Sequence, residues 1–188
     1  MAEVLLFHHA LGLTPGVQAF AGEISAAGHT VHTPDLYEGA TFRSVADGVA
    51  HAKSIGFDVI MERGREVASL LRPGLVYGGF SLGVVPAQML VQTRPGARGA
   101  LFFHGAIPTS EFDGPWPAGV PLQIHTMEND EMGDIDVARD LAASIEGAEL
   151  YVYAGDSHLF TDSGSADYDE TATKLVMSRV LAFLERAG

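Results

Sequence analysis

Short apolar runs recur along the whole sequence, and stretches with helical spacing of their apolar residues separate them. Most of these runs are continuously apolar, which is typical of parallel strands covered on both faces. Strand and helix patterns that alternate in this way predict an α/β fold, with a mostly parallel sheet, right-handed crossovers and helices on both faces. The six runs that we expect to form strands are Val4–His8, Thr30–Thr33, Leu75–Gly79, Ala100–His104, Leu122–Thr126 and Glu149–Tyr153.

The intervening segments carry start and stop signals for helices. Thr14 followed by Pro15 predicts a helix start, and Gly28 predicts its end. Two helices are expected between Ser44 and Leu71, and three more over Leu82–Gln92, Asp134–Ile145 and Tyr168–Arg186, with Asp134 as a helix cap. A chain of 188 residues fits one domain, so we expect residues 1–188 to form a single domain.

Composition and charge exclude several classes of function. The chain has no cysteine, so disulfides, cysteine-ligated zinc and a thiol nucleophile are impossible. A net charge of −13 argues against binding to nucleic acid and to anionic membranes. The segment MAEVLLFHHALG has an acidic residue where a signal peptide has basic ones, which favours a cytoplasmic protein.

One motif points to chemistry. Gly79–Gly83 reads G-x-S-x-G, between an expected strand and an expected helix. This pattern is typical of a nucleophilic serine on a tight strand-to-helix turn, so Ser81 is the candidate nucleophile. In parallel sheets of this kind, ligands bind beyond the carboxyl ends of the strands, where Ser81 would lie.

A serine nucleophile needs a base to take its proton and an acid to orient that base, and in this fold they follow it in the order acid, then histidine. His104 and His125 end apolar strands, whereas His158 lies in a loop after the sixth run, so His158 is the candidate base. The loop after the fifth run offers four acids, of which we favour Asp130 because Asn129 beside it suits a turn. The four are Glu128, Asp130, Glu131 and Asp134.

The reaction also needs donors for the developing oxyanion. One is expected to be the backbone N–H of Leu82, and the other to come from the HHALGL loop, with Ala10 as the candidate and Leu11 as the alternative. His9 and Leu11 are expected to face the substrate pocket, together with Phe112 and Trp116 from a loop rich in glycine and proline.

Several segments together resemble the dienelactone hydrolase family of α/β-hydrolases. They are HHALGLTPGVQAFAGEISAAGHTVHTPDLYEG, GGFSLGVVPA, HTMENDEM and YAGDSHLF. The resemblance runs from about Val4 to Phe160. It implies a minimal α/β-hydrolase fold without a cap domain, and a catalytic triad that falls on Ser81, Asp130 and His158.

The sequence departs from the family in three places. Ser81 replaces the cysteine nucleophile of the best-known members, and the stretch His8–Ala10 replaces a glutamate that contacts their thiol. Thr161 and Asp162 stand where members that act on dienelactone carry an arginine for its carboxylate. We therefore expect hydrolysis of small esters, lactones or thioesters through an acyl-enzyme on Ser81, without a cofactor, and leave dienelactone itself open.

Two other interpretations remain. The chain could be a non-catalytic binding protein on a hydrolase scaffold, which a fluorophosphonate probe would distinguish from a serine hydrolase. A metal site among the histidines is disfavoured because no H-x-x-x-H or H-E-x-x-H spacing is present. The sequence leaves the oligomeric state open.

Overall fold

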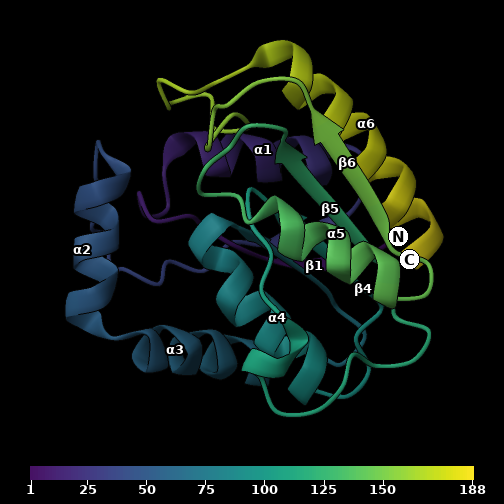
Figure 1. Cartoon of the computed structure of the whole chain (residues 1–188). Helices are drawn as coiled ribbons and strands as arrows, with labels where there is room; N and C mark the ends of the chain where they lie inside the picture. Colours follow the sequence, from purple (N-terminus) through teal and green to yellow (C-terminus); the bar gives the residue numbers. More distant parts are fainter.

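The computed structural model describes residues 1–188, and its strands form one fully parallel six-stranded sheet in the order β2-β1-β3-β4-β5-β6 (Figure 1). The expected strands are confirmed, each within one residue at either end. Their bounds are β1 Glu3–Phe7, β2 Thr30–His32, β3 Val76–Phe80, β4 Gly99–Phe103, β5 Leu122–Met127 and β6 Glu149–Tyr153.

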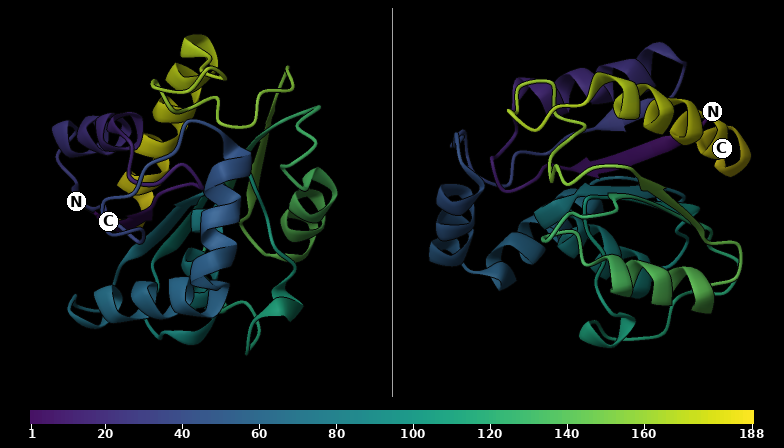
Figure 2. Two further views of the ribbon diagram at one scale, coloured as in Figure 1. Left: turned by 90° about the vertical axis from the view of Figure 1, so that its left-hand side faces the viewer. Right: turned by 45° about the horizontal axis from the view of Figure 1, so that its top comes forward.

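Five of the six α-helices form two layers on the sheet, and α2 packs against α3. Helices α1 and α6 cover one face, and α3, α4 and α5 cover the other (Figure 2). No segment inserted between the strands forms a cap domain. The helix bounds are α1 Pro15–Ala26, α2 Val45–Ile55, α3 Phe57–Ser69, α4 Val84–Thr93, α5 Ile135–Ser144 and α6 Glu170–Ala187.

The inner strand β1 shows how the sequence builds a core on both faces of the sheet. Leu5 and Phe7 join the apolar cluster under α3, α4 and α5, while Val4 and Leu6 join the cluster under α1 and α6. Successive side chains of a strand point to opposite faces, so a continuously apolar strand has to be covered twice. Because helices cover both faces of the sheet, the loops meet at the carboxyl ends of the strands.

The helix ends follow the expected signals with one exception. The Thr14 side chain caps α1 by accepting a hydrogen bond from the Val17 N–H at 3.2 Å. Asp134, by contrast, precedes α5 without capping it: its backbone is left-handed, with φ 48° and ψ 49°, and its side chain accepts no capping hydrogen bond. Asp134 thus occupies the expected N-cap position of α5, but the side-chain hydrogen bond expected of a cap is absent.

None of the helices is both long and apolar enough to cross a membrane.

Candidate active site

Ser81 lies on a sharp turn between β3 and α4. Its φ of 47° is left-handed, a conformation that costs a residue with a side chain about 1–2 kcal/mol. The flanking glycines permit the turn, because a Cβ on Gly79 would lie 2.1 Å from the Gly83 carbonyl oxygen, and one on Gly83 would lie 2.4 Å from that of Phe7. The serine hydroxyl is thus held at the carboxyl edge of the sheet by backbone that packs without space for side chains.

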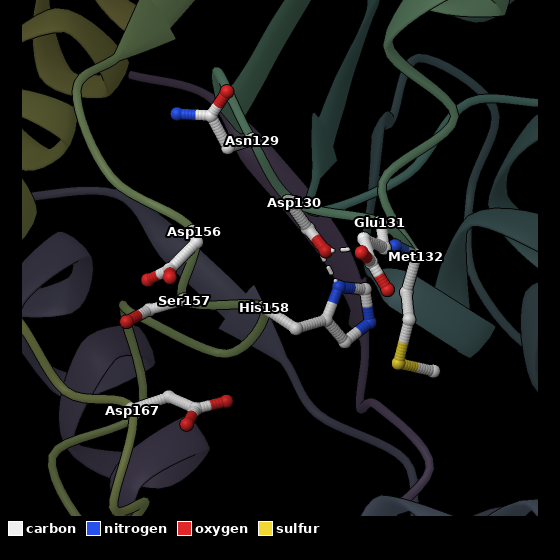
Figure 3. A pocket seen from close by; sticks show the side chains of 8 residues that line it. All are labelled: Asn129, Asp130, Glu131, Met132, Asp156, Ser157, His158 and Asp167. Atoms are coloured by element: carbon white, nitrogen blue, oxygen red, sulfur yellow. Dashed lines mark hydrogen bonds and ion pairs between the residues drawn. The ribbon is translucent and has the colours of Figure 1, made fainter.

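The structure brings Ser81, His158 and Asp130 together from three different loops. Ser81 Oγ lies 2.8 Å from His158 Nε2. His158 Nδ1 in turn lies 2.7 Å from Asp130 Oδ2, a contact that Figure 3 shows. His158 and Asp130 are both buried, whereas Ser81 is partly exposed. This chain of contacts is the arrangement by which an imidazole removes a proton from a serine and an acid orients the imidazole.

Asp130 differs from the other acids of its loop. It is 5% exposed, and its Oδ1 accepts a hydrogen bond from the Met132 N–H at 2.9 Å. Gly133 leaves the room for this carboxylate, since a Cβ there would lie 2.7 Å from Asp130 Oδ2. The remaining acids of the loop are exposed: Glu128, Glu131 and Asp134.

The loop after β1, residues His8–Gly12, is called here the β1 loop, and it packs directly against the serine turn. A Cβ on Gly83 would come within 2.8 Å of the His8 carbonyl oxygen. The Leu11 N–H already donates to His9 Nδ1 at 3.2 Å, so it is engaged within the loop. Of the two candidate oxyanion donors in this loop, Ala10 is the one that this contact favours.

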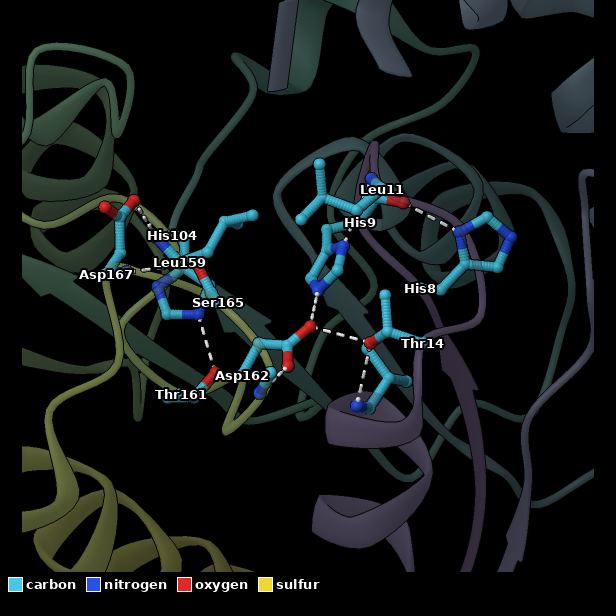
Figure 4. A network of polar contacts seen from close by, with 12 residues as sticks. His8, His9, Leu11, Thr14, His104, Leu159, Thr161, Asp162, Ser165 and Asp167 are labelled. Carbon is cyan, nitrogen blue, oxygen red and sulfur yellow. Dashed lines mark hydrogen bonds and ion pairs between the residues drawn. The ribbon is translucent and has the colours of Figure 1, made fainter. Parts of the chain in front are cut away.

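His8 and His9 both point into the protein and hold the β1 loop (Figure 4). His8 Nδ1 donates to the His9 carbonyl at 2.7 Å, and His8 Nε2 accepts from the Leu36 N–H at 3.0 Å. Burial lowers the pKa of His8 to about 4, so this imidazole is neutral at neutral pH. His9 Nε2 contacts the carboxylate of Asp162 at 2.7 Å.

Backbone strain gathers around one small pocket beside the nucleophile. Of the four non-glycine residues with positive φ, three line this pocket of about 160 Å³: Ser81 (47°), His104 (62°) and Asp134 (48°). Its remaining lining includes apolar side chains, among them Val84, Val85, Ala106, Ile107 and Met132. Strained residues of this kind often cluster at functional sites.

A larger hollow of about 590 Å³ is lined by His158. Asp130 and Met132 help to form it, and three further acids surround it: Glu131, Asp156 and Asp167 (Figure 3). Neither pocket is lined by lysine or arginine. An anionic group would find no cationic partner among these lining residues.

The remaining histidines at this edge are structural in their contacts. His104 is buried, and its Nε2 lies 2.7 Å from Thr161 Oγ1; burial and the neighbouring histidines lower its pKa well below the usual value. His125 lies between the Tyr153 hydroxyl and Gln123, and burial lowers its pKa to about 3. No group of three or more potential ligands is arranged to hold a metal ion.

The structure does not bring Phe112 and Trp116 to the site. Trp116 donates its indole N–H to the Val120 carbonyl, packs edge-on against Phe102 and lines a separate pocket with the end of α5. Phe112 is partly buried and packs against the same core cluster. This loop precedes β5 and so lies away from the carboxyl ends of the strands, where Ser81 and His158 meet.

Sequence reasoning missed the role of one residue in the network. Asp162 is only 2% exposed and is held by three hydrogen bonds, yet the sequence drew attention to it only as the replacement of an arginine. An acid four positions after a histidine is not a recognised sequence motif. The partner His9 lies 153 residues away, so only the fold brings the two together.

Comparisons with known proteins identify the family of the chain and its fold. The model of the dienelactone hydrolase family matches residues 1–188. Among solved structures, a dienelactone hydrolase candidate from Klebsiella pneumoniae is 17% identical, with 98% of this chain and 87% of that chain covered and a TM-score of 0.78. A dienelactone hydrolase from Anabaena variabilis is 15% identical (99% and 86% covered, TM-score 0.74).

A third similar structure is a dienelactone hydrolase-like promiscuous phosphotriesterase from metagenomic libraries. It is 15% identical, with 100% of this chain and 87% of that chain covered and a TM-score of 0.75. At these identities the likeness establishes the fold. No protein with a curated description matches the sequence.

Proposed function

Because the chain belongs to the dienelactone hydrolase family, we propose that it is a serine hydrolase that cleaves small carboxylic esters or lactones through an acyl-enzyme on Ser81. The observation that carries the proposal is the unbroken chain of contacts from Ser81 Oγ through His158 to Asp130, with the serine on a strained turn. Family membership alone supports a hydrolase; these contacts support the nucleophile and its base.

In the first step, Ser81 Oγ attacks the ester carbonyl carbon while His158 Nε2 takes the hydroxyl proton. The carbonyl π electrons move to oxygen, and the backbone N–H groups of Leu82 and Ala10 stabilise that oxyanion. Collapse of the intermediate breaks the bond to the alkoxy oxygen, which receives the proton from His158. Asp130 keeps the proton of the imidazole on Nδ1 and stabilises the imidazolium.

In the second step, water replaces the alcohol. His158 takes a proton from the water as its oxygen attacks the acyl carbon, the second oxyanion collapses, and the Ser81 oxygen leaves and regains a proton from His158. The products are a carboxylic acid and the free enzyme, so the cycle needs no cofactor.

The pockets support an uncharged substrate of small size. The apolar pocket beside Ser81 is about 160 Å³, smaller than the roughly 300 Å³ and more of typical sites for drug-sized ligands. The acids that surround the larger hollow, Glu131, Asp156 and Asp167, would repel a substrate carboxylate. A neutral ester, lactone or thioester fits both features better than an anionic lactone does.

The test is labelling and turnover of purified protein. A fluorophosphonate probe should label the wild type and not Ser81→Ala, and that variant should hydrolyse p-nitrophenyl acetate at least about 10³-fold more slowly. Melting curves check that the variant stays folded. Failure of the probe to label the wild type would favour a non-catalytic binding protein, and near-normal turnover by Ser81→Ala would exclude Ser81 as nucleophile.

A further inference from the structure

We infer that Asp162 is a positioning residue of this hydrolase: by holding one tautomer of His9, it fixes the β1 loop that supplies an oxyanion donor. The inference rests on the proposed hydrolase function. It assigns Asp162 a role in catalysis although its carboxylate contacts neither Ser81 nor His158.

The surroundings of Asp162 are built for a carboxylate anion. Its Oδ2 accepts hydrogen bonds from His9 Nε2 at 2.7 Å and from the Thr14 hydroxyl at 2.6 Å, and its Oδ1 accepts from the Gly164 N–H at 2.7 Å (Figure 4). A Cβ on Gly16 would lie 1.6 Å from Oδ1, so only glycine leaves room for the carboxylate. Burial favours the neutral acid, but the three hydrogen bonds outweigh it and lower the pKa of Asp162.

The carboxylate determines where His9 carries its proton. An ionised carboxylate only accepts hydrogen bonds, so His9 Nε2 has to be the protonated nitrogen. His9 Nδ1 then has a free lone pair, which accepts the Leu11 N–H at 3.2 Å. In the opposite tautomer, the proton would be on His9 Nδ1, and this N–H would face the Leu11 N–H.

These contacts hold the peptide units on both sides of Ala10. The His9 carbonyl accepts from His8 Nδ1 at 2.7 Å and from the Gly12 N–H at 3.0 Å. Since the peptide bond is planar and trans, holding this carbonyl also fixes the direction of the Ala10 N–H in the same unit. The next peptide is held through the Leu11 N–H by His9 Nδ1, and that bond depends on Asp162.

Removal of the carboxylate should therefore weaken the oxyanion donor and leave substrate binding nearly intact. We expect Asp162→Ala to lower kcat about ten-fold on p-nitrophenyl acetate with KM little changed, because the donor acts mainly in the transition state. Asp162→Asn can turn its amide oxygen toward His9 and Thr14, which retains the acceptor. It should lose clearly less activity than Asp162→Ala does.

Two controls separate positioning from loss of stability. Asp169→Ala removes the side chain that caps α6 by accepting from the Ala172 N–H, and it should lower the melting temperature without lowering kcat. His9→Asn keeps a side-chain oxygen near the place of Nδ1 but no longer reaches Asp162. In that background Asp162→Ala should cost little further activity, because the two residues act as one unit.

A second readout is independent of catalysis. Nitrogen chemical shifts of labelled histidine should show His9 protonated on Nε2 in the wild type and in Asp162→Asn, and a mixture of tautomers in Asp162→Ala. An unchanged tautomer in Asp162→Ala would overturn the inference. So would an unchanged kcat in that variant, or an equal loss of kcat in the His9→Asn background. A wild type without turnover or probe labelling would contradict the proposed function instead, and the tautomer measurement distinguishes that failure.

Discussion

Two histidine–aspartate pairs lie at the carboxyl edge of the sheet, and each is joined by a 2.7 Å contact. In the pair His158–Asp130, the far imidazole nitrogen faces the Ser81 hydroxyl at 2.8 Å. In the pair His9–Asp162, the far nitrogen faces the backbone N–H of Leu11 at 3.2 Å. A hydroxyl can give up its proton to the imidazole, whereas an amide N–H in practice cannot. We therefore propose that the same kind of pair acts as a base in one place and as a support in the other.

The largest expected difference concerns the two aspartates. Asp130→Asn should lower kcat about 10³–10⁴-fold, because the base loses both its orientation and the charge that stabilises its imidazolium. The same change at Asp162 should cost less than about ten-fold. Steady-state kinetics of both variants on one ester, with melting curves, measure the contrast. Equal losses would show that the two pairs do not differ in role.

Low pH should destabilise the folded protein that carries both pairs. His8 and His125 have pKa values of about 4 and 3 in the folded protein, below the value of roughly 6.5 expected on unfolding. Between about pH 6.5 and 4 the unfolded chain thus binds more protons, and folding stability falls with falling pH by up to about 1.4 kcal/mol per pH unit for each histidine. Urea unfolding at pH 7, 6 and 5 measures this slope.

His125→Gln is the matched variant for the acid experiment, since it removes one buried histidine from outside the two pairs. This variant should reduce the change of unfolding free energy with pH by the contribution of one histidine. A slope that does not change would mean that His125 takes up no proton on unfolding in this range.

Loss of His9 from the pair His9–Asp162 should reduce activity less than loss of His158 from the pair His158–Asp130. His9→Ala should lower kcat/KM about ten-fold, a loss of about 1.4 kcal/mol of transition-state stabilisation. His9→Glu should not restore the rate, because its carboxylate would face Asp162 in a buried site. The measurement is kcat/KM of both variants on one ester. Wild-type rates in either variant would contradict a supporting role for His9.

The smallest effect is expected at Asp134, an acid of the Asp130 loop that belongs to neither pair. Asp134 is left-handed and makes no capping hydrogen bond, and asparagine tolerates that conformation well. Asp134→Asn should change the free energy of unfolding by less than about 0.5 kcal/mol and leave kcat unchanged. A large loss of activity would point to a contact of Asp134 with substrate in the pocket that it lines.

The elements of the fold and the contacts among Ser81, Asp130 and His158 could be expected from the sequence for a physical reason. Strands that are continuously apolar are compatible with few sheet topologies. In a parallel sheet, the loops that carry function lie at one edge. Each loop then offers few residues of the right chemistry. The position of Asp134 before α5 was expected, but its missing side-chain cap was not, because residue type alone does not reveal a left-handed backbone.

The His9–Asp162 pair could not be predicted in this way. It joins two loops that are distant in the chain, and its space exists only because Gly16 lacks a side chain. Trp116 shows the opposite error: an aromatic residue in a glycine- and proline-rich loop was expected in the substrate pocket, but its indole packs edge-on against Phe102 and lines a separate pocket. Long-range packing decides such cases.

The segment His158–Asp162 has a consequence for attempts to build hybrid enzymes. It carries the histidine of one pair and the aspartate of the other, while their partners Asp130 and His9 lie on two other loops. A chimaera that imports this segment from a relative without an aspartate at the position of Asp162 would keep the histidine of the first pair but deprive His9 of its acid. The loops after β1, β5 and β6 therefore form one unit of exchange, and grafting or recombination should move all three together.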